Sequence, residues 1–124
     1  MDFQPSDWFR FIHLDLFTKR WNKLGLDDDA LRSLEVAILT IGGRAPVVKG
    51  TGGLRKCRFS PPGLNLSKRE AFRICYALFL EYGTVLLVTA YGKNEQDDLS
   101  PADRKAIAQV IKKIQEQLER EVIR

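Results

Sequence analysis

Two runs of strand-forming residues, joined by a short turn, constrain this chain more than any other feature. Residues 71–80 read AFRICYALFL and residues 84–91 read TVLLVTAY, with EYG between them. Both runs are rich in β-branched and aromatic residues, and two such runs around a glycine-containing turn are typical of an antiparallel hairpin. One face of the first run is apolar and is expected to lie on helices: Phe72, Ile74, Tyr76, Leu78 and Leu80. The other face carries Arg73, Cys75 and Ala77.

Two helices are predicted before this hairpin. DLFTKRWNKL, from Asp15 to Leu24, reads as a short helix ended by Gly25, a common C-terminal stop. DDDALRSLEVAILTIGG reads as a second helix, since its three aspartates suit the positive N-terminal end and its two glycines close it. The apolar stripe of this helix recurs at spacings of three and four: Leu31, Leu34, Ile38 and Ile41. The two helices are expected to form a helical hairpin.

A last helix is predicted from Pro101 onward. Ser100 is its expected cap, Pro101 suits the first helical position, and Asp103 completes a capping-box-like pattern. Its apolar stripe is Ile107, Val110, Ile111, Ile114 and Leu118. This stripe predicts a helix that packs one face against the core.

The remaining segments are short. LRKCRF is predicted as a strand after the loop RAPVVKGTGG, and SPPGLNLSKRE is too rich in turn formers for regular structure. The stretch from Trp8 to Leu14 fits a short strand or a helical turn, and periodicity does not decide over so few residues. Together these segments predict an α+β fold, a small antiparallel β-sheet meander with an N-terminal helical hairpin and a C-terminal helix on one face. The length of 124 residues predicts one domain, residues 1–124.

Charge and cysteine content narrow the classes of function. The net charge of +4 favours a polyanionic partner, although charge that serves only solubility gives the same number. No apolar run approaches the roughly 18 residues of a membrane span, and MDFQPSDWFR lacks the pattern of a signal peptide. We therefore expect a cytoplasmic protein that does not bind membranes. Cys57 and Cys75 lack C-x-x-C spacing and are expected to be reduced, half-buried strand residues.

Positive charge gathers on the predicted strands. Arg55, Lys56 and Arg58 lie on the first sheet strand, Arg73 lies on the next, and Lys93 follows the third. Lys56 and Arg58 share a face, whereas Arg55 points to the opposite face unless a bulge intervenes. The face of Arg73 depends on a strand register that the sequence does not give. Protection of a sheet edge against aggregation is the alternative, but cations from several neighbouring strands favour an anion site.

Familiar phosphate, metal and nucleophile motifs are missing from the sequence. There is no G-x-x-x-x-G-K-S/T loop, and GTGG precedes a strand rather than a helix, so a flexible hinge is the favoured interpretation. His13, the single histidine, sits among apolar residues. Glu95, Asp97 and Asp98 can in principle hold a hard cation, but their place before a helix N-terminus favours dipole complementation. We expect no metal and no cofactor.

Metal-free chemistry on a phosphate backbone, or simple binding to it, remains. RNA carries its own nucleophile in the 2′-hydroxyl, so a protein cleaves it by deprotonating that group, stabilising the charge on the phosphate and protonating the leaving oxygen. Arginines supply the electrostatic stabilisation, and a lysine crowded by other cations acquires a lowered pKa suited to a base. Tyr91 is a candidate for stacking on a base or for proton transfer. DNA lacks the hydroxyl and would be bound but left intact.

Three motifs resemble one family in the right order and spacing. GTGGLRKCRF, FRICYALF and VLLVTAYGKNEQDDLSPADRKAI are similar to the RelE/HigB superfamily of bacterial toxins from type II toxin–antitoxin modules. The HigB-like branch, with GTGGLRK, R-[VI]-x-Y and [AI]-Y-[GA]-K-N-E-x-x-D-L, resembles them most, and FTKRWNKLGLDDDALRSLE also resembles that branch. The resemblance covers roughly Phe17 to Ala108.

The resemblance implies an endoribonuclease, an mRNA interferase that cuts messenger RNA on the translating ribosome and inhibits translation. It implies a cognate helix-turn-helix antitoxin as partner, with operator DNA bound only through that antitoxin. By motif, the catalytic roles fall on Lys56, Arg58, Arg73, Lys93 and Tyr91. The RNA-binding roles fall on Arg55 and Asn94.

The chain departs from the family pattern at two places. SKREAFR carries Glu70 and Ala71 where the branch usually has a pair of glycines, and DDLS stands where the RelE line often has an aromatic residue. The first departure bears on the loop over the active face, and the second leaves a stacking or acid–base role unassigned. Two alternatives stay open, a non-catalytic inhibitor that binds DNA gyrase and a plain RNA-binding module whose basic face only positions phosphates.

Overall fold

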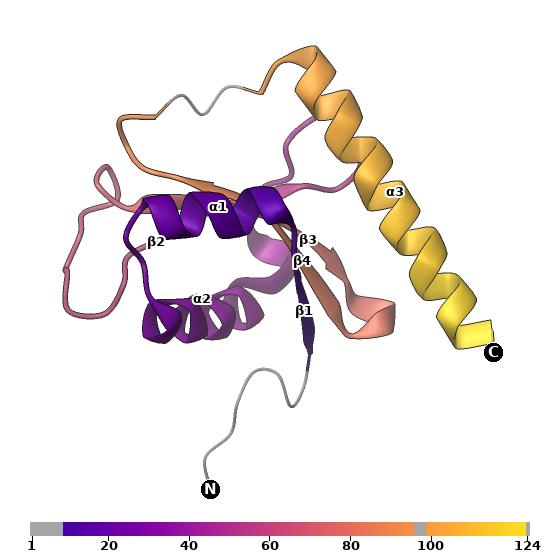
Figure 1. Ribbon diagram of the computed structural model, residues 1–124, viewed down its shortest axis with the longest axis horizontal. Helices are drawn as coiled ribbons and strands as arrows, with labels where there is room; N and C mark the ends of the chain where they lie inside the picture. Colours follow the sequence, from indigo (N-terminus) through magenta and orange to yellow (C-terminus); the bar gives the residue numbers. More distant parts are fainter. Residues whose placement is uncertain (1–8, 96–98, 124) are drawn as a thin grey trace, which may run out of the picture.

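The chain folds around one sheet with helices on either side of it (Figure 1). The computed structural model describes residues 9–95 and 99–123. Within these residues the elements are, in order, β1 (Arg10–His13), α1 (Asp15–Lys23), α2 (Asp28–Ile41), β2 (Arg55–Phe59), β3 (Phe72–Phe79), β4 (Thr84–Tyr91) and α3 (Pro101–Ile123). Two short 3-10 turns, η2 (Gly42–Arg44) and η3 (Leu80–Tyr82), follow α2 and β3. The α+β class, the central hairpin and the C-terminal helix are confirmed.

The sheet is mixed rather than wholly antiparallel. The strand order is β1-β4-β3-β2, with β2 antiparallel to β3 and β3 antiparallel to β4. β1 runs parallel to β4, with Arg10 opposite Thr84 and His13 opposite Leu87. The stretch near the N-terminus is thus a strand, but its direction against a partner some 70 residues away is a tertiary property that local sequence does not carry.

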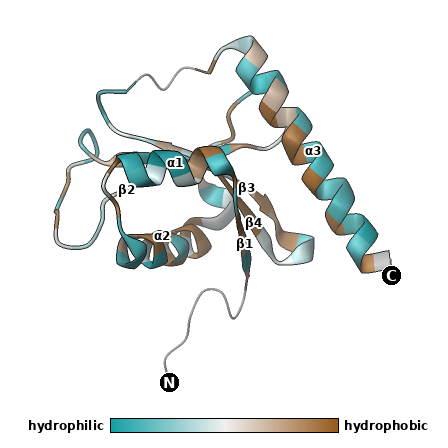
Figure 2. Ribbon diagram, in the orientation of Figure 1, coloured by the Kyte–Doolittle hydropathy of each residue, from teal (hydrophilic) through white to brown (hydrophobic). Residues whose placement is uncertain are grey.

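Helices cover both faces of the sheet, which corrects the expectation that they share one face. One buried cluster joins β2, β3 and β4 to α1 and α2 and includes Phe17, Leu34, Ile38, Ile74 and Tyr76. A second cluster on the opposite face joins β3, β4 and the residue before β2 to α3, and it includes Leu54, Cys75, Leu86, Ile111 and Leu118. Figure 2 shows the cause, since β3 and β4 are hydrophobic along most of their length. All eight residues of β4 are buried, so the strand needs cover on both sides.

α1 and α2 begin and end close to the predicted residues, and α3 begins at Pro101 as predicted. Asp27 caps α2 by accepting a hydrogen bond from the Ala30 N–H at 2.8 Å. Gly25, just after α1, has a φ of +77°, a left-handed conformation that favours glycine. Before α3, the Ser100 N–H donates to Asp103 and the Asp103 N–H donates to Ser100 Oγ, each at 3.1 Å. These contacts are the reciprocal capping box that the sequence predicts.

The GTGG segment is an ordered turn and not a hinge. Thr51 is fully buried; its hydroxyl donates to the Val48 carbonyl at 2.5 Å and accepts from the Leu54 N–H at 3.0 Å. The turn lies against α3, because a Cβ added to Gly52 would meet Ala108 at 3.5 Å. Arg104 of α3 also donates to the Lys49 carbonyl at 2.9 Å. The start of β2 is therefore fixed to the C-terminal helix.

Several local expectations change in the folded chain. Leu80 does not face the helices, because β3 ends at Phe79 and Leu80 lies in η3 with 64% of its surface exposed. Cys57 and Cys75 are reduced as expected, but they are buried rather than half-buried and lie on opposite faces of the sheet. Trp8, Asp97 and Asp98 lie outside the described residues. Among the helices described, none has the length and apolar character needed to cross a bilayer.

Candidate nucleic-acid interface

The strand register brings residues from three strands into one line across the sheet. Arg58 of β2 lies opposite Arg73 of β3, and Arg73 lies opposite Tyr91 of β4. Residues directly opposite one another in a sheet point to the same face, so these three side chains share a face. We call Arg58, Arg73 and Tyr91 the cross-sheet row. Lys56 lies on the same face, because it is two residues from Arg58 and opposite Cys75.

A bulge in β4 places Tyr91 in this row. The register of β3 with β4 shifts between Cys75, opposite Thr89, and Tyr76, opposite Leu87, which leaves Val88 as an extra residue. Before the bulge Leu87 belongs to the cluster on the α1–α2 side, whereas after it Tyr91 belongs to the cluster on the α3 side. Without the extra residue the alternation along β4 would send Tyr91 to the face away from Arg73.

The four side chains on this face differ in how exposed they are and in how they are held. Arg58 is exposed, Lys56 and Arg73 are half-buried, and Tyr91 is buried with 7% of its surface exposed. The Arg73 guanidinium donates through Nη1 to the Arg69 carbonyl at 3.0 Å and also to the Ala71 carbonyl. Arg73 is therefore held in place by the loop that precedes its own strand.

That loop is a tight turn built by Ser67 and Glu70. The Ser67 hydroxyl donates to Glu70 Oε1 at 2.8 Å, and the Ala71 N–H donates to the Ser67 carbonyl at 2.9 Å. The hydrogen bonds from the Ser67 side chain and backbone lower the pKa of Glu70, and the charge of Lys93 lowers it further. Because Arg73 lies opposite Tyr91, the turn after β4 lies near the turn before β3. Glu70, which departs from the RelE/HigB-like sequence pattern, thus lies at the rim of this face.

Lys93 and Asn94 are the two exposed central residues of the turn between Gly92 and Glu95. The Glu95 N–H donates to the Gly92 carbonyl at 3.1 Å, and the Gly92 N–H donates to Glu95 Oε1 at 2.9 Å. The turn follows directly on Tyr91, so it extends the cross-sheet row beyond the end of β4.

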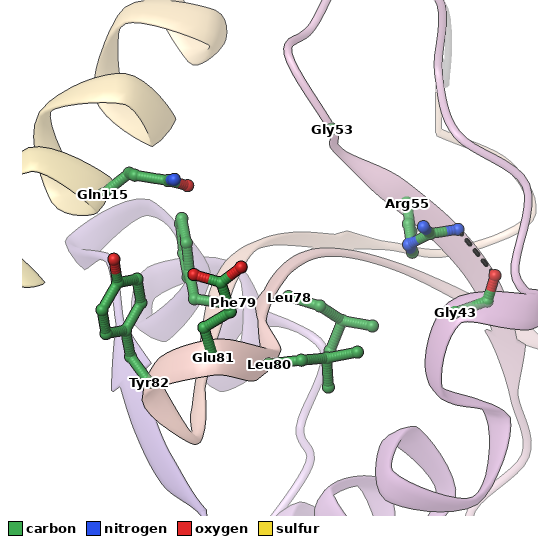
Figure 3. A pocket seen from close by; sticks show the side chains of 9 residues that line it. All are labelled: Gly43, Gly53, Arg55, Leu78, Phe79, Leu80, Glu81, Tyr82 and Gln115. Carbon is green, nitrogen blue, oxygen red and sulfur yellow. Dashed lines mark hydrogen bonds between the residues drawn. The ribbon is translucent and has the colours of Figure 1, made fainter. Parts of the chain in front are cut away.

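Arg55, which the sequence analysis assigns to RNA binding, does not share a face with the cross-sheet row. It lies on the opposite face of β2, and its Nη1 donates to the Gly43 carbonyl at 2.9 Å and the Ala45 carbonyl at 2.7 Å. Figure 3 shows Arg55 on one side of a hollow of about 320 Å³, whose other side carries Glu81, Tyr82 and Gln115. Lys56, Arg58, Arg73 and Tyr91 do not line this hollow. Arg55 therefore anchors β2 to the η2 turn that follows α2.

Sequence reasoning missed the residues that hold the site loops. The S-x-x-E pattern from Ser67 to Glu70 is a turn and cap signature and could have been read as one. The ion pair of Arg20 with Glu95 joins residues 75 positions apart, so no local sequence pattern predicts it.

Over residues 9–95 and 99–123, no group of three or more histidine, cysteine or acidic side chains is placed to hold a metal ion. The pKa of His13 is lowered by burial, and its ring packs on Phe17 at 5.6 Å.

The fold and this face define a small α+β domain with a mixed four-stranded sheet, cations at one end of the sheet and an amphipathic C-terminal helix over the rest of that face. No family model matches the chain. Among solved structures, it is similar to the isolated E. coli RelE toxin, with 13% identity, 86% of this chain and 98% of that chain covered, and a TM-score of 0.48. It is also similar to an E. coli RelE mutant with two arginines replaced by alanine, in the free state, with 15% identity, 70% and 84% coverage, and a TM-score of 0.45.

Proposed function

We propose that this chain is the toxin of a type II toxin–antitoxin module and that it cleaves messenger RNA on the ribosome. The observation that carries the proposal is the cross-sheet row together with Lys56, because Lys56, Arg58 and Arg73 come from two strands and share a face. The three sequence motifs that resemble the RelE/HigB superfamily contain these residues. A plain solvated face gives no reason for two arginines to stand directly opposite each other.

The chemistry we propose uses the RNA as its own nucleophile. A basic side chain, with Lys56 as the candidate, takes the proton of the 2′-hydroxyl, and the 2′-oxygen attacks the adjacent phosphorus. Arg58 and Arg73 stabilise the negative charge that develops on the phosphate oxygens. The bond to the 5′-oxygen breaks and that oxygen takes up a proton, with Tyr91 or Lys93 as its source. The products are a 2′,3′-cyclic phosphate and a 5′-hydroxyl, and no metal takes part.

Cleavage is tested with purified protein, ribosomes and a defined message, with new ends mapped by primer extension. The proposal expects new 5′ ends that appear only with ribosomes present and that persist in EDTA. A message carrying one 2′-deoxynucleotide at the mapped site should resist cutting there. A folded wild-type protein that leaves the message intact would overturn the proposal. Intact RNA together with blocked DNA supercoiling would point to the gyrase inhibitor, and salt-sensitive RNA binding without cutting would point to the binding module.

Arg58→Ala tests the catalytic role with the least structural disturbance, because Arg58 is exposed whereas Arg73 donates hydrogen bonds to the carbonyls of the preceding loop. Removing one electrostatic stabiliser of the transition state is expected to slow cutting about 10²–10³-fold. Arg32→Ala, which removes an exposed cation from α2, serves as the matched control. Equal effects of the two substitutions would argue against a site at the cross-sheet row.

The partner we propose is a helix-turn-helix antitoxin that binds operator DNA, with the toxin reaching that DNA only through it. A partner that covers a cationic face is expected to present acidic or apolar anchors. Co-expression of the antitoxin candidate from the adjacent reading frame should restore growth of cells that produce this chain in the cytoplasm. Continued arrest with both proteins present would argue against the pairing.

A further inference from the structure

The turn from Gly92 to Glu95 is closed twice by the same residue. The Glu95 backbone donates to the Gly92 carbonyl at 3.1 Å, and the Glu95 side chain accepts from the Gly92 N–H through Oε1 at 2.9 Å. A turn closed at both ends has little freedom, so the directions of its central residues are set. Those central residues are Lys93 and Asn94.

The second oxygen of the same carboxylate leaves the turn and reaches a helix. Glu95 Oε2 accepts a hydrogen bond from Arg20 Nη1 of α1 at 2.6 Å, in an ion pair whose side chains are 38% and 30% exposed. Both oxygens of Glu95 are therefore engaged, one with its own turn and one with α1. Partly exposed ion pairs of this kind contribute little to folding, so stability alone does not account for the arrangement.

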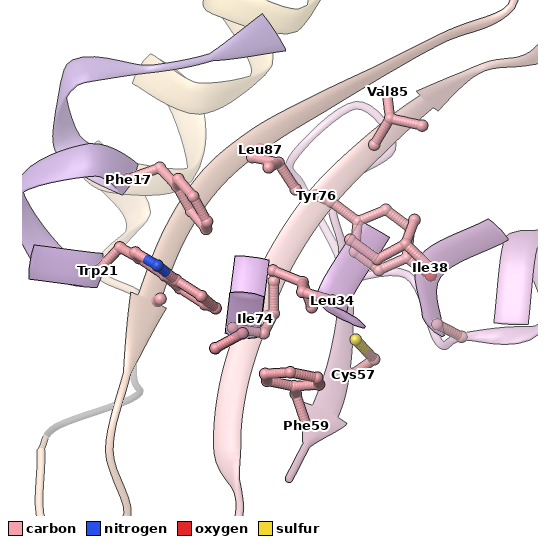
Figure 4. Packing of buried hydrophobic residues seen from close by; sticks show 13 residues of the cluster. Phe17, Trp21, Leu34, Ile38, Cys57, Phe59, Ile74, Tyr76, Val85 and Leu87 are labelled. Carbon is pink, nitrogen blue, oxygen red and sulfur yellow. The ribbon is translucent and has the colours of Figure 1, made fainter. Parts of the chain in front are cut away.

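The helix that receives Glu95 is a rigid support. Figure 4 shows Phe17 and Trp21 of α1 directed into the cluster under the sheet. Their rings stack at 5.5 Å, and both side chains are almost fully buried. Leu24, which directly follows α1, packs against the same cluster, and a Cβ added to Gly92 would lie 3.7 Å from it. The turn after β4 thus rests on the end of α1 and does not project alone into solvent.

We propose that Glu95 is a positioning residue, which holds the 92–95 turn on Arg20 of α1 so that Lys93 and Asn94 face a bound RNA beside the cross-sheet row. The inference rests on the proposed function for the identity of the ligand. Glu95 itself touches no substrate and acts through the two central residues of its turn. Arg20, on the layer opposite the row, then contributes to RNA cleavage without any contact with RNA.

The functional arm of the test is a double-mutant cycle. Glu95→Ala is expected to lower kcat/KM for ribosome-bound message about 10–100-fold, as a small displacement of positioned groups does. Glu95→Gln, whose amide oxygen still accepts from Gly92, is expected to lose less. In a protein that already carries Lys93→Ala and Asn94→Ala, the further change Glu95→Ala should cost nothing, because Glu95 acts through those residues. A full additional loss in that background would overturn the proposal.

The structural arm is independent of cleavage. Amide hydrogen exchange of residues 92–95 should accelerate in Glu95→Ala and in Arg20→Gln, and should recover in part in the reversed pair Arg20→Glu with Glu95→Arg. Arg32→Gln removes a comparable surface ion pair, Arg32 with Asp29, and should leave both exchange and kcat/KM unchanged. If the wild type cuts no RNA, the proposed function fails while this arm still decides the role of Glu95. Unchanged exchange at 92–95 in Glu95→Ala would overturn the positioning role by itself.

Discussion

Two arginines are register partners on neighbouring strands of this sheet. Arg58 and Arg73 are register partners on one face, and Lys56 is two residues away on the same strand and face. Like charges placed directly across a sheet repel each other, and a bound phosphate relieves the repulsion. At the residue scale, we therefore expect a bound anion to stabilise the cross-sheet row.

Arg58→Gln should consequently stabilise the protein in the absence of anions. Loss of the cross-strand repulsion is expected to raise the free energy of unfolding by roughly 0.2–0.5 kcal/mol at low ionic strength, and less in salt because Arg58 is exposed. Urea denaturation at two salt concentrations measures the change. Lys19→Gln, an exposed substitution on α1, is the control and should shift the midpoint little. A destabilised Arg58→Gln protein would show that Arg58 has a favourable structural role.

The buried Tyr76 hydroxyl and Cys57 thiol lead to a second prediction at the residue scale, which concerns stability at alkaline pH. Burial raises the pKa of Tyr76 to about 12 from 10.0, and burial raises that of Cys57 to about 11 from 9.0. Figure 4 shows both side chains in the cluster beneath β2 and β3. Their neutral forms are favoured in the folded state, so the associated stability is complete below the unfolded pKa values. It is lost as pH rises through the folded values.

The free energy of unfolding should therefore fall as pH rises from about 9 toward 12. Tyr76→Phe should flatten this fall above pH 10, since one of the two groups is removed. It should also cost about 1 kcal/mol at neutral pH, because the Tyr76 hydroxyl donates to the Gly42 carbonyl at 3.0 Å. Urea denaturation between pH 7 and 11 measures both effects. An identical pH slope in wild type and variant would contradict the assignment to Tyr76.

At the scale of elements, the parts predicted from sequence are those whose cause is local. The hairpin of β3 and β4, the Asp27 cap of α2 and the capping box at Ser100 each depend on residues within a few positions of one another. The parallel pairing of β1 and the bulge at Val88 depend on distant partners. The bulge matters most for the site, because alternation alone would have assigned Tyr91 to the wrong face. Burial of β4 on both faces, in contrast, is indicated by the unbroken apolar run VLLV at residues 85–88.

The turn before β2 yields the element-scale prediction. Thr51→Val removes the hydroxyl that serves Val48 and Leu54 and buries a methyl in its place. The Leu54 N–H loses its acceptor in a buried site, so the expected cost is about 1–3 kcal/mol of unfolding free energy. Thr51→Ser keeps the hydroxyl and should cost less. Denaturant midpoints measure both variants, and equal stability of the two would mean that these hydrogen bonds do not hold the turn.

At the scale of the whole molecule, the sheet separates two functions of the same strand. The odd-numbered residues of β2, Arg55, Cys57 and Phe59, face α2 and anchor the strand, while Lys56 and Arg58 face the proposed RNA. The net charge of +4 arises from 20 cations and 16 anions, so the long-range field is weak. Affinity for a polyanion then depends on which cations share a face and not on their total number.

This separation predicts unequal salt dependence for two arginines of one strand. For binding of a 2′-O-methyl RNA oligonucleotide, each cation that contacts a phosphate adds about 0.7 to the slope of log affinity against log salt. Arg58→Gln should lower the slope by about that amount, because its charge is exposed on the face of the cross-sheet row. Arg55→Gln should leave the slope unchanged, because the Arg55 guanidinium donates to the Gly43 and Ala45 carbonyls on the other face of the sheet. Circular dichroism checks that this variant is folded. Fluorescence anisotropy over a range of salt concentrations gives both slopes. If the two substitutions lowered the slope equally, RNA would bind the strand from its edge, and the sheet would not divide anchoring from recognition.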